Sequence, residues 1–132
     1  MSGDAARNAY GLRFTLERRH LHVRVVGHKD DLATTVACWR DFAAEVRRTG
    51  AVTLLVEDDL QGPPLAPEDM PAFMEAMKGE GLAEVRIAYV EAIAQRIGQV
   101  EVGEILAREL GFVARVFASR MDAEMWLRHG ER

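Results

Sequence analysis

The sequence is short of cysteine, of long apolar runs and of any export signal. Cys38 is the only cysteine in 132 residues, so no internal disulfide can form, which fits a reducing cytoplasm. No apolar run approaches the roughly 18 residues of a membrane span. The polar stretch 1–8 lacks the apolar core of a secretion signal. We therefore expect a cytoplasmic protein with no transmembrane segment.

Signature motifs of catalysis are also missing. The chain contains no G-x-S-x-G elbow, no P-loop, no G-x-G-x-x-G and no H-E-x-x-H. Acidic residues outnumber basic ones 21 to 17, which gives no support to a nucleic acid as partner. We therefore predict no catalytic residue, no metal and no cofactor. A non-enzymatic domain is favoured over an enzyme.

Apolar residues are present in quantity, at 48% of the chain, which is enough for the core of one domain. Their spacing alternates between the periods of strands and of helices. Strands are predicted at 12–19, 20–26, 51–57, 84–90 and 112–118, and helices at about 31–49, 67–78, 100–110 and from Ser119 onward. This β-β-α-β-α-β-α-β-α order predicts one α/β domain. Its sheet is mixed but mostly parallel, with an antiparallel first strand and helices mainly on one face.

Parts of this pattern resemble a known family. The hairpin, the helix 31–50 with its central Trp39 and the strand 51–57 look like the first half of a SpoIIAA-like domain. Residues 112–127 are similar to that family's closing strand and its acidic-Ala-x-x-Trp-Leu helix. The resemblance covers about residues 13–128. It implies a bacterial domain akin to STAS domains, the anti-sigma-factor antagonists, that acts through a protein partner or as a homodimer. We place this domain at 12–129, after a flexible segment at 1–11.

One feature of the signalling relatives is absent. Anti-sigma-factor antagonists carry an Asp-Ser-Ser-Gly-like motif after the third strand, and its serine is switched by phosphorylation. The corresponding stretch 56–62 has no hydroxyl side chain, and the only serines, Ser2 and Ser119, lie elsewhere. We therefore expect no phosphorylation switch of that kind.

A candidate binding site lies at the end of the strand 51–57, where open α/β folds place ligands. An acidic pair is followed there by a helix with an apolar stripe of methionine and phenylalanine, suited to a small apolar ligand. The candidate residues are Asp58, Asp59, Leu60, Met70, Phe73 and Met74. In an alternative, segment 58–78 is the mobile lid of a lipid carrier or small enzyme. The plainer interpretation, a solvated acidic loop and an ordinary core helix, is also open.

The second face of the predicted sheet carries basic side chains. It contains His22, Arg24, Arg86 and Arg115, with Glu57 among them. This face can bind an anion or an acidic partner, although solvation with pairing to Glu57 is the simpler interpretation. His20, His22 and His28 can suit a metal, but we favour polar alternation in a hairpin because no ligand set is complete. Cys38 is expected to be a buried structural thiol.

Overall fold

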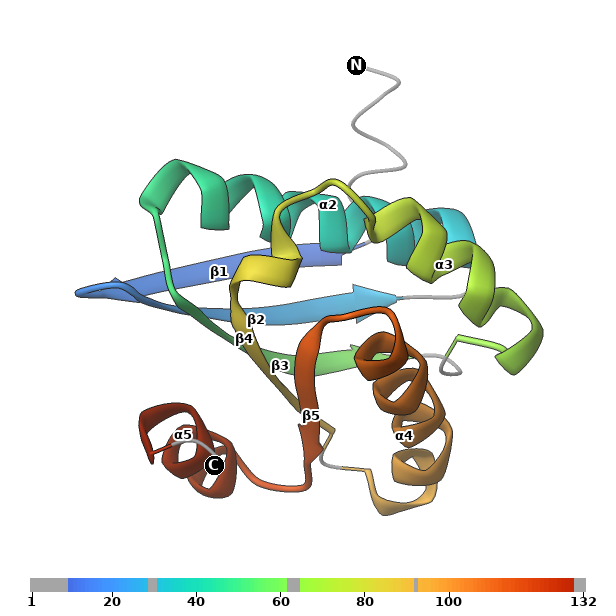
Figure 1. The fold of residues 1–132 in the computed structure, drawn as a ribbon. Helices are drawn as coiled ribbons and strands as arrows, with labels where there is room; N and C mark the ends of the chain where they lie inside the picture. The colour runs from blue at the N-terminus through green and yellow to red at the C-terminus, as the bar shows by residue number, and fades with distance from the viewer. Residues whose placement is uncertain (1–9, 29–30, 62–64, 92, 130–132) are drawn as a thin grey trace.

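The computed structural model describes residues 10–28, 31–61, 65–91 and 93–129. It contains one five-stranded sheet whose strands lie in sequence order (Figure 1). The strands are β1 (Tyr10–Glu17), β2 (His20–His28), β3 (Thr53–Gln61), β4 (Arg86–Val90) and β5 (Val113–Phe117). β1 is antiparallel to β2, and β2 to β5 are mutually parallel. This architecture confirms the predicted fold class.

Helices lie on both faces of the sheet but unequally. They are α2 (Leu32–Thr49), α3 (Met70–Met77), α4 (Ala94–Glu109) and α5 (Arg120–His129), with 3-10 turns η1 (Pro67–Asp69) and η2 (Leu82–Glu84). Because parallel strands in sequence order require crossovers of one hand, α2, α3 and α4 fall on the same face, as predicted. α5 follows the last strand and packs on the opposite face (Figure 1). No helix in the described ranges is long and apolar enough to cross a membrane.

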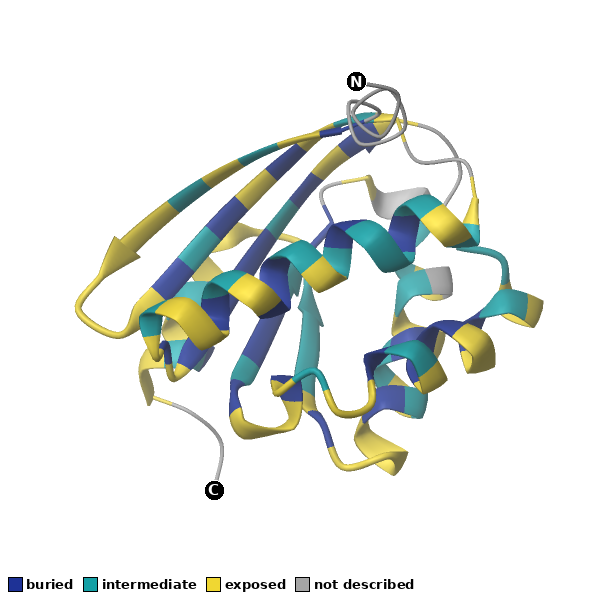
Figure 2. Ribbon diagram, turned by 90° about the horizontal axis from the view of Figure 1, so that it is seen from above, coloured by how far each residue is buried: buried dark blue, intermediate teal, exposed yellow. Residues whose placement is uncertain are grey.

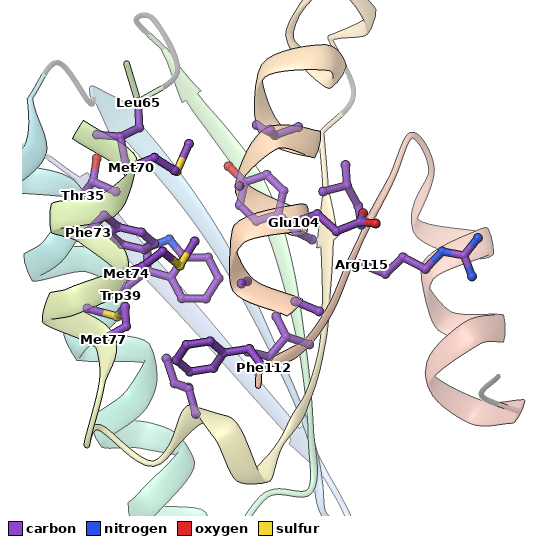
Figure 3. A pocket seen from close by; sticks show the side chains of 18 residues that line it. Thr35, Trp39, Leu65, Met70, Phe73, Met74, Met77, Glu104, Phe112 and Arg115 are labelled. Atoms are coloured by element: carbon purple, nitrogen blue, oxygen red, sulfur yellow. The ribbon is translucent and has the colours of Figure 1, made fainter. Parts of the chain in front are cut away.

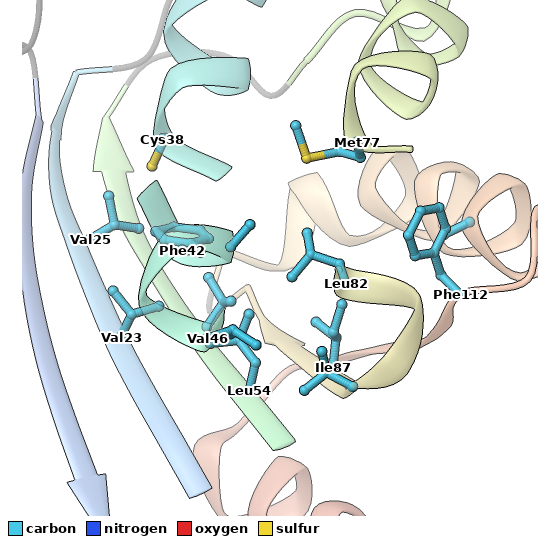
Figure 4. Close-up of a cluster of buried hydrophobic side chains, with 14 of the residues drawn as sticks. Val23, Val25, Cys38, Phe42, Val46, Leu54, Met77, Leu82, Ile87 and Phe112 are labelled. Carbon is cyan, nitrogen blue, oxygen red and sulfur yellow. The ribbon is translucent and has the colours of Figure 1, made fainter. Parts of the chain in front are cut away.

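α2 begins and ends where the sequence predicts. The Asp31 side chain accepts a hydrogen bond of 2.8 Å from the Thr34 N–H, and Gly50 ends the helix with a left-handed φ of 70°. Its buried stripe packs on the inward side chains of β2 and β3 (Figure 4). Burial alternates along the first part of β2 (Figure 2), whereas the first four residues of β3 are all buried and alternation begins only after them. The buried core therefore lies between α2, α3 and the sheet.

Three predicted boundaries were wrong. β3 runs on to Gln61, because β2 continues to His28 and offers a backbone partner at every position. α4 begins at Ala94 rather than near residue 100. β1 begins at Tyr10, so the flexible segment predicted at 1–11 includes two strand residues, and the rest of it, 1–9, lies outside the described residues.

Candidate functional site

A cavity of about 120 Å³ lies between α3, α4 and the sheet (Figure 3). α3 forms one wall, and its side chains at Met70, Phe73, Met74 and Met77 all border the space. The spacing of these four residues puts them on a single face of the helix, and all four are buried. The apolar stripe predicted from sequence therefore exists and borders a cavity.

α4 forms the facing wall with small residues. Gly103 and Ala107 border the cavity on this side. A Cβ placed on Gly103 would lie 3.3 Å from the sulfur of Met70, so glycine allows α4 to approach α3 closely. Gly103 and Ala107 therefore add little side-chain volume on this side of the cavity.

An aromatic group closes the inner end of the cavity. Trp39 of α2 stacks on Tyr89 of β4, with ring centroids 6.1 Å apart and an interplanar angle of 13°. Phe73 meets the Trp39 ring edge-on at 5.9 Å. Neither Trp39 nor Tyr89 was predicted as a site residue. The position of Trp39 in the apolar stripe of α2 was a signal in the sequence that it packs against the core. No local pattern shows that Tyr89 of β4 faces that helix.

Tyr89 is tied to a buried carboxylate. Its hydroxyl donates to Asp58 Oδ2, and Asp58 Oδ1 accepts the Leu60 N–H at 2.9 Å. Burial raises the pKa of Tyr89 well above its ordinary value, and the charges of Asp58 and Glu91 raise it further. Tyr89 therefore stays protonated at neutral pH, with its proton directed at Asp58.

The predicted ligand-binding residues are only partly brought together. Met70, Phe73 and Met74 line the cavity. Asp58 and Leu60 lie behind Trp39 and Tyr89, beside a separate space of only about 10 Å³. Asp59 points to the opposite face of the sheet, where its Oδ2 accepts from Arg24 Nε at 2.6 Å.

The expected acidic loop was therefore wrong. Asp58 and Asp59 are consecutive residues of β3, and consecutive side chains of a strand point to opposite faces. They cannot act as a pair of carboxylates on one ligand. The segment proposed as a lid also loses 58–61 to the sheet, and its residues 62–64 lie outside the described residues.

The second sheet face carries the predicted basic side chains, and they are paired. His22 Nε2 lies 2.6 Å from Glu57 Oε1, and Arg120 Nη1 lies 3.5 Å from the same oxygen. Arg86 donates to the Trp126 carbonyl at 3.3 Å and lies over the Trp126 ring. Arg115 lies over the ring of Phe117. Arg86 is thus in contact with α5. His22 and Arg24 lie farther from α5, on β2.

The remaining candidates have structural surroundings. His20 Nδ1 lies 2.7 Å from Thr53 Oγ1. Across the ranges that the structure describes, no group of three histidine, cysteine or acidic side chains is arranged to hold a metal. Cys38 is buried in α2, as predicted.

Comparison with known proteins bears on the fold. A solved structure of an uncharacterised protein from the DUF3478 family with a SpoIIAA-like fold, from Shewanella loihica PV-4, matches this chain with a TM-score of 0.54. Sequence identity is 12%, and the match covers 90% of this chain and 93% of that chain. No protein-family model and no curated protein matches. The chain therefore has a SpoIIAA-like fold, as the sequence resemblance predicted.

Proposed function

We propose that this chain is a non-enzymatic binding domain that holds a small apolar molecule between α3, α4 and the sheet. The observation that carries the proposal is the cavity of about 120 Å³ with its methionine and aromatic lining. An apolar cavity of about 150 Å³ in another protein stays dry and binds benzene. A ligand of about one aromatic ring therefore suits this space, and the flexible methionines can adapt to its shape.

The hydroxyl groups at the cavity support binding rather than catalysis. Tyr89 donates its proton to Asp58, and Thr35 Oγ1 donates to the Asp31 carbonyl at 3.1 Å. Thr35 donates to a backbone carbonyl, which is not a base, and the raised pKa of Tyr89 keeps its hydroxyl protonated beside Asp58, so neither group is activated as a nucleophile.

Fluorescence of Trp39 tests this proposal directly. Trp39 lines the cavity, and the second tryptophan, Trp126, lies on the opposite face and can be replaced. The Trp126 Nε1 has no hydrogen-bond partner in the described structure, so Trp126→Phe sacrifices no hydrogen bond. In this background we expect toluene to change the Trp39 emission with saturation.

Two substitutions on β5 provide the block and its control. Ala114 lines the cavity, so Ala114→Leu fills part of it and is expected to abolish the toluene response. Val113 is the preceding residue, is exposed and does not line the cavity, so Val113→Leu should leave the response unchanged. Absence of a saturable response, or an equal response with Ala114→Leu, would contradict the proposal.

A protein contact on the second sheet face is a second candidate. Arg13 of β1 lies directly opposite Arg24 of β2, an unfavourable pairing of like charges. Arg24 is bonded to Asp59, but Arg13 has no acidic partner among the described residues. We propose that an acidic partner surface, or an acidic surface of a second copy, contacts Arg13. Native mass spectrometry of the wild type and of Arg13→Glu tests for a dimer. A dimer unaffected by Arg13→Glu would rule out this face as its interface.

A further inference from the structure

The charged groups around the cavity are unevenly distributed. Asp58 lies directly behind Tyr89, and Glu91 is buried to 2% exposure near the same ring. Glu104 of α4 lines the cavity wall, and its carboxylate accepts the Val116 N–H at 2.8 Å and pairs with Arg108. Acidic groups thus lie at the inner end of the cavity and along one of its sides.

The cationic residue that borders the cavity does not balance these charges. Arg115 contributes to the lining, but its guanidinium lies over the ring of Phe117, 5.6 Å from the centroid. Its side chain extends away from the cavity toward α5 (Figure 3). A ligand between α3 and α4 would therefore not contact this positive charge.

The neutral hydrogen-bond donors at the cavity are also largely bonded to other groups of the protein. The protons of Tyr89 and Thr35 are directed at Asp58 and at the Asp31 carbonyl. Their oxygen lone pairs remain, and these attract donors rather than anions. Trp39 adds an indole N–H, but a single neutral donor does not offset the cost of bringing a full negative charge out of water.

We propose that the cavity selects neutral ligands, an arene or a small alcohol, and excludes carboxylates of the same size. This inference rests on the proposed function and specifies its ligand class. An anion in this space would lose its hydration, meet the field of Asp58 and Glu91, and find no cation within the cavity. A hydroxyl group is uncharged, so bringing an alcohol into this space costs far less than bringing in a carboxylate.

Fluorine NMR with three matched probes tests the charge selectivity at pH 7. The probes are 4-fluorotoluene, 4-fluorobenzyl alcohol and 4-fluorobenzoate, which share one ring and differ in the group opposite the fluorine. We expect 4-fluorotoluene and 4-fluorobenzyl alcohol to bind. The affinity for 4-fluorobenzoate should be at least about tenfold lower than the affinity for the alcohol. Equal affinity for the alcohol and the benzoate would overturn the inference and leave the proposed function intact. If 4-fluorotoluene does not bind, the proposed function itself fails.

A substitution on α3 should reverse the preference. Met74 is buried and lines the cavity, so Met74→Lys would place an ammonium group there. We expect this variant to prefer the benzoate, while the neutral and similarly shaped Met74→Gln keeps the preference for the alcohol. Far-UV circular dichroism verifies the fold of both variants. If folded Met74→Lys binds the benzoate no better than the wild type does, charge is not what the cavity selects. The wild-type probe series decides the proposal even if the lysine variant does not fold.

Discussion

Arg18, in the turn between β1 and β2, has a backbone conformation that is costly for a residue with a side chain. Its φ is 59°, and it joins Glu17 to His20 in a two-residue hairpin turn. The left-handed region costs about 1–2 kcal/mol for most residues, and glycine avoids this cost. We therefore expect Arg18→Gly to raise the free energy of unfolding by about 0.5–1 kcal/mol in urea titration.

The neighbouring arginine is the control for this turn. Arg19 has no positive φ, and its Nε donates to the Gly50 carbonyl at 3.2 Å. Arg19→Gly should therefore lower the stability, because it adds chain entropy to the unfolded state and removes this bond. If Arg18→Gly were the more destabilising of the two, strain at Arg18 would not explain the turn.

Tyr89 links the buried site to pH. The unfolded chain loses the Tyr89 proton from about pH 10 upward, whereas the folded chain keeps it because its pKa is raised. The folded state then binds more protons, so this contribution to stability is complete below pH 10 and is lost as the pH rises further. We expect the wild type to lose more unfolding free energy between pH 8 and 11 than Tyr89→Phe does. Equal losses in the two proteins would show that Tyr89 titrates normally.

At the scale of elements, α3 has the weakest local support of the helices around the cavity. It has eight residues and no capping side-chain hydrogen bond, whereas α2 has 18 residues and is capped by Asp31. Short isolated helices are marginal in water, so α3 depends on its packing. We expect its amides to exchange with deuterium faster than those of α2, and to slow when toluene is bound. If the amides of α3 exchange as slowly as those of α2, and toluene does not change their exchange, α3 is not a mobile wall of the cavity.

The elements also show how far sequence reasoning reaches. α2 was predictable because its stripe, its cap and its stop are all local. The α3 stripe was predictable for the same reason, and with it three residues of the cavity. The end of β3 was not, because Asp58 and Asp59 have the local character of a loop while their strand conformation is imposed by pairing with β2. The cavity itself depends on the small residues of α4 facing α3, which no single segment reveals.

At the scale of the whole molecule, the two faces of the sheet differ. The face under α2, α3 and α4 carries the main buried core, whereas the opposite face is covered by α5 over β3 and β4 and carries paired charged side chains on β2 and the end of β3. Asp58 is buried and accepts from Tyr89 and Leu60. Asp59 makes an exposed ion pair with Arg24, of a kind that contributes little to stability. Asp58→Ala removes the acceptor of the Tyr89 hydroxyl and should cost about 1–3 kcal/mol in urea unfolding, whereas Asp59→Ala should be nearly neutral. Comparable losses from both variants would mean that the two faces do not differ as the structure describes.

The same two variants should also differ in ligand binding. Asp58→Ala should free the Tyr89 proton toward the cavity and so weaken the discrimination of the cavity against 4-fluorobenzoate. Asp59→Ala, on the far face, should leave that discrimination unchanged.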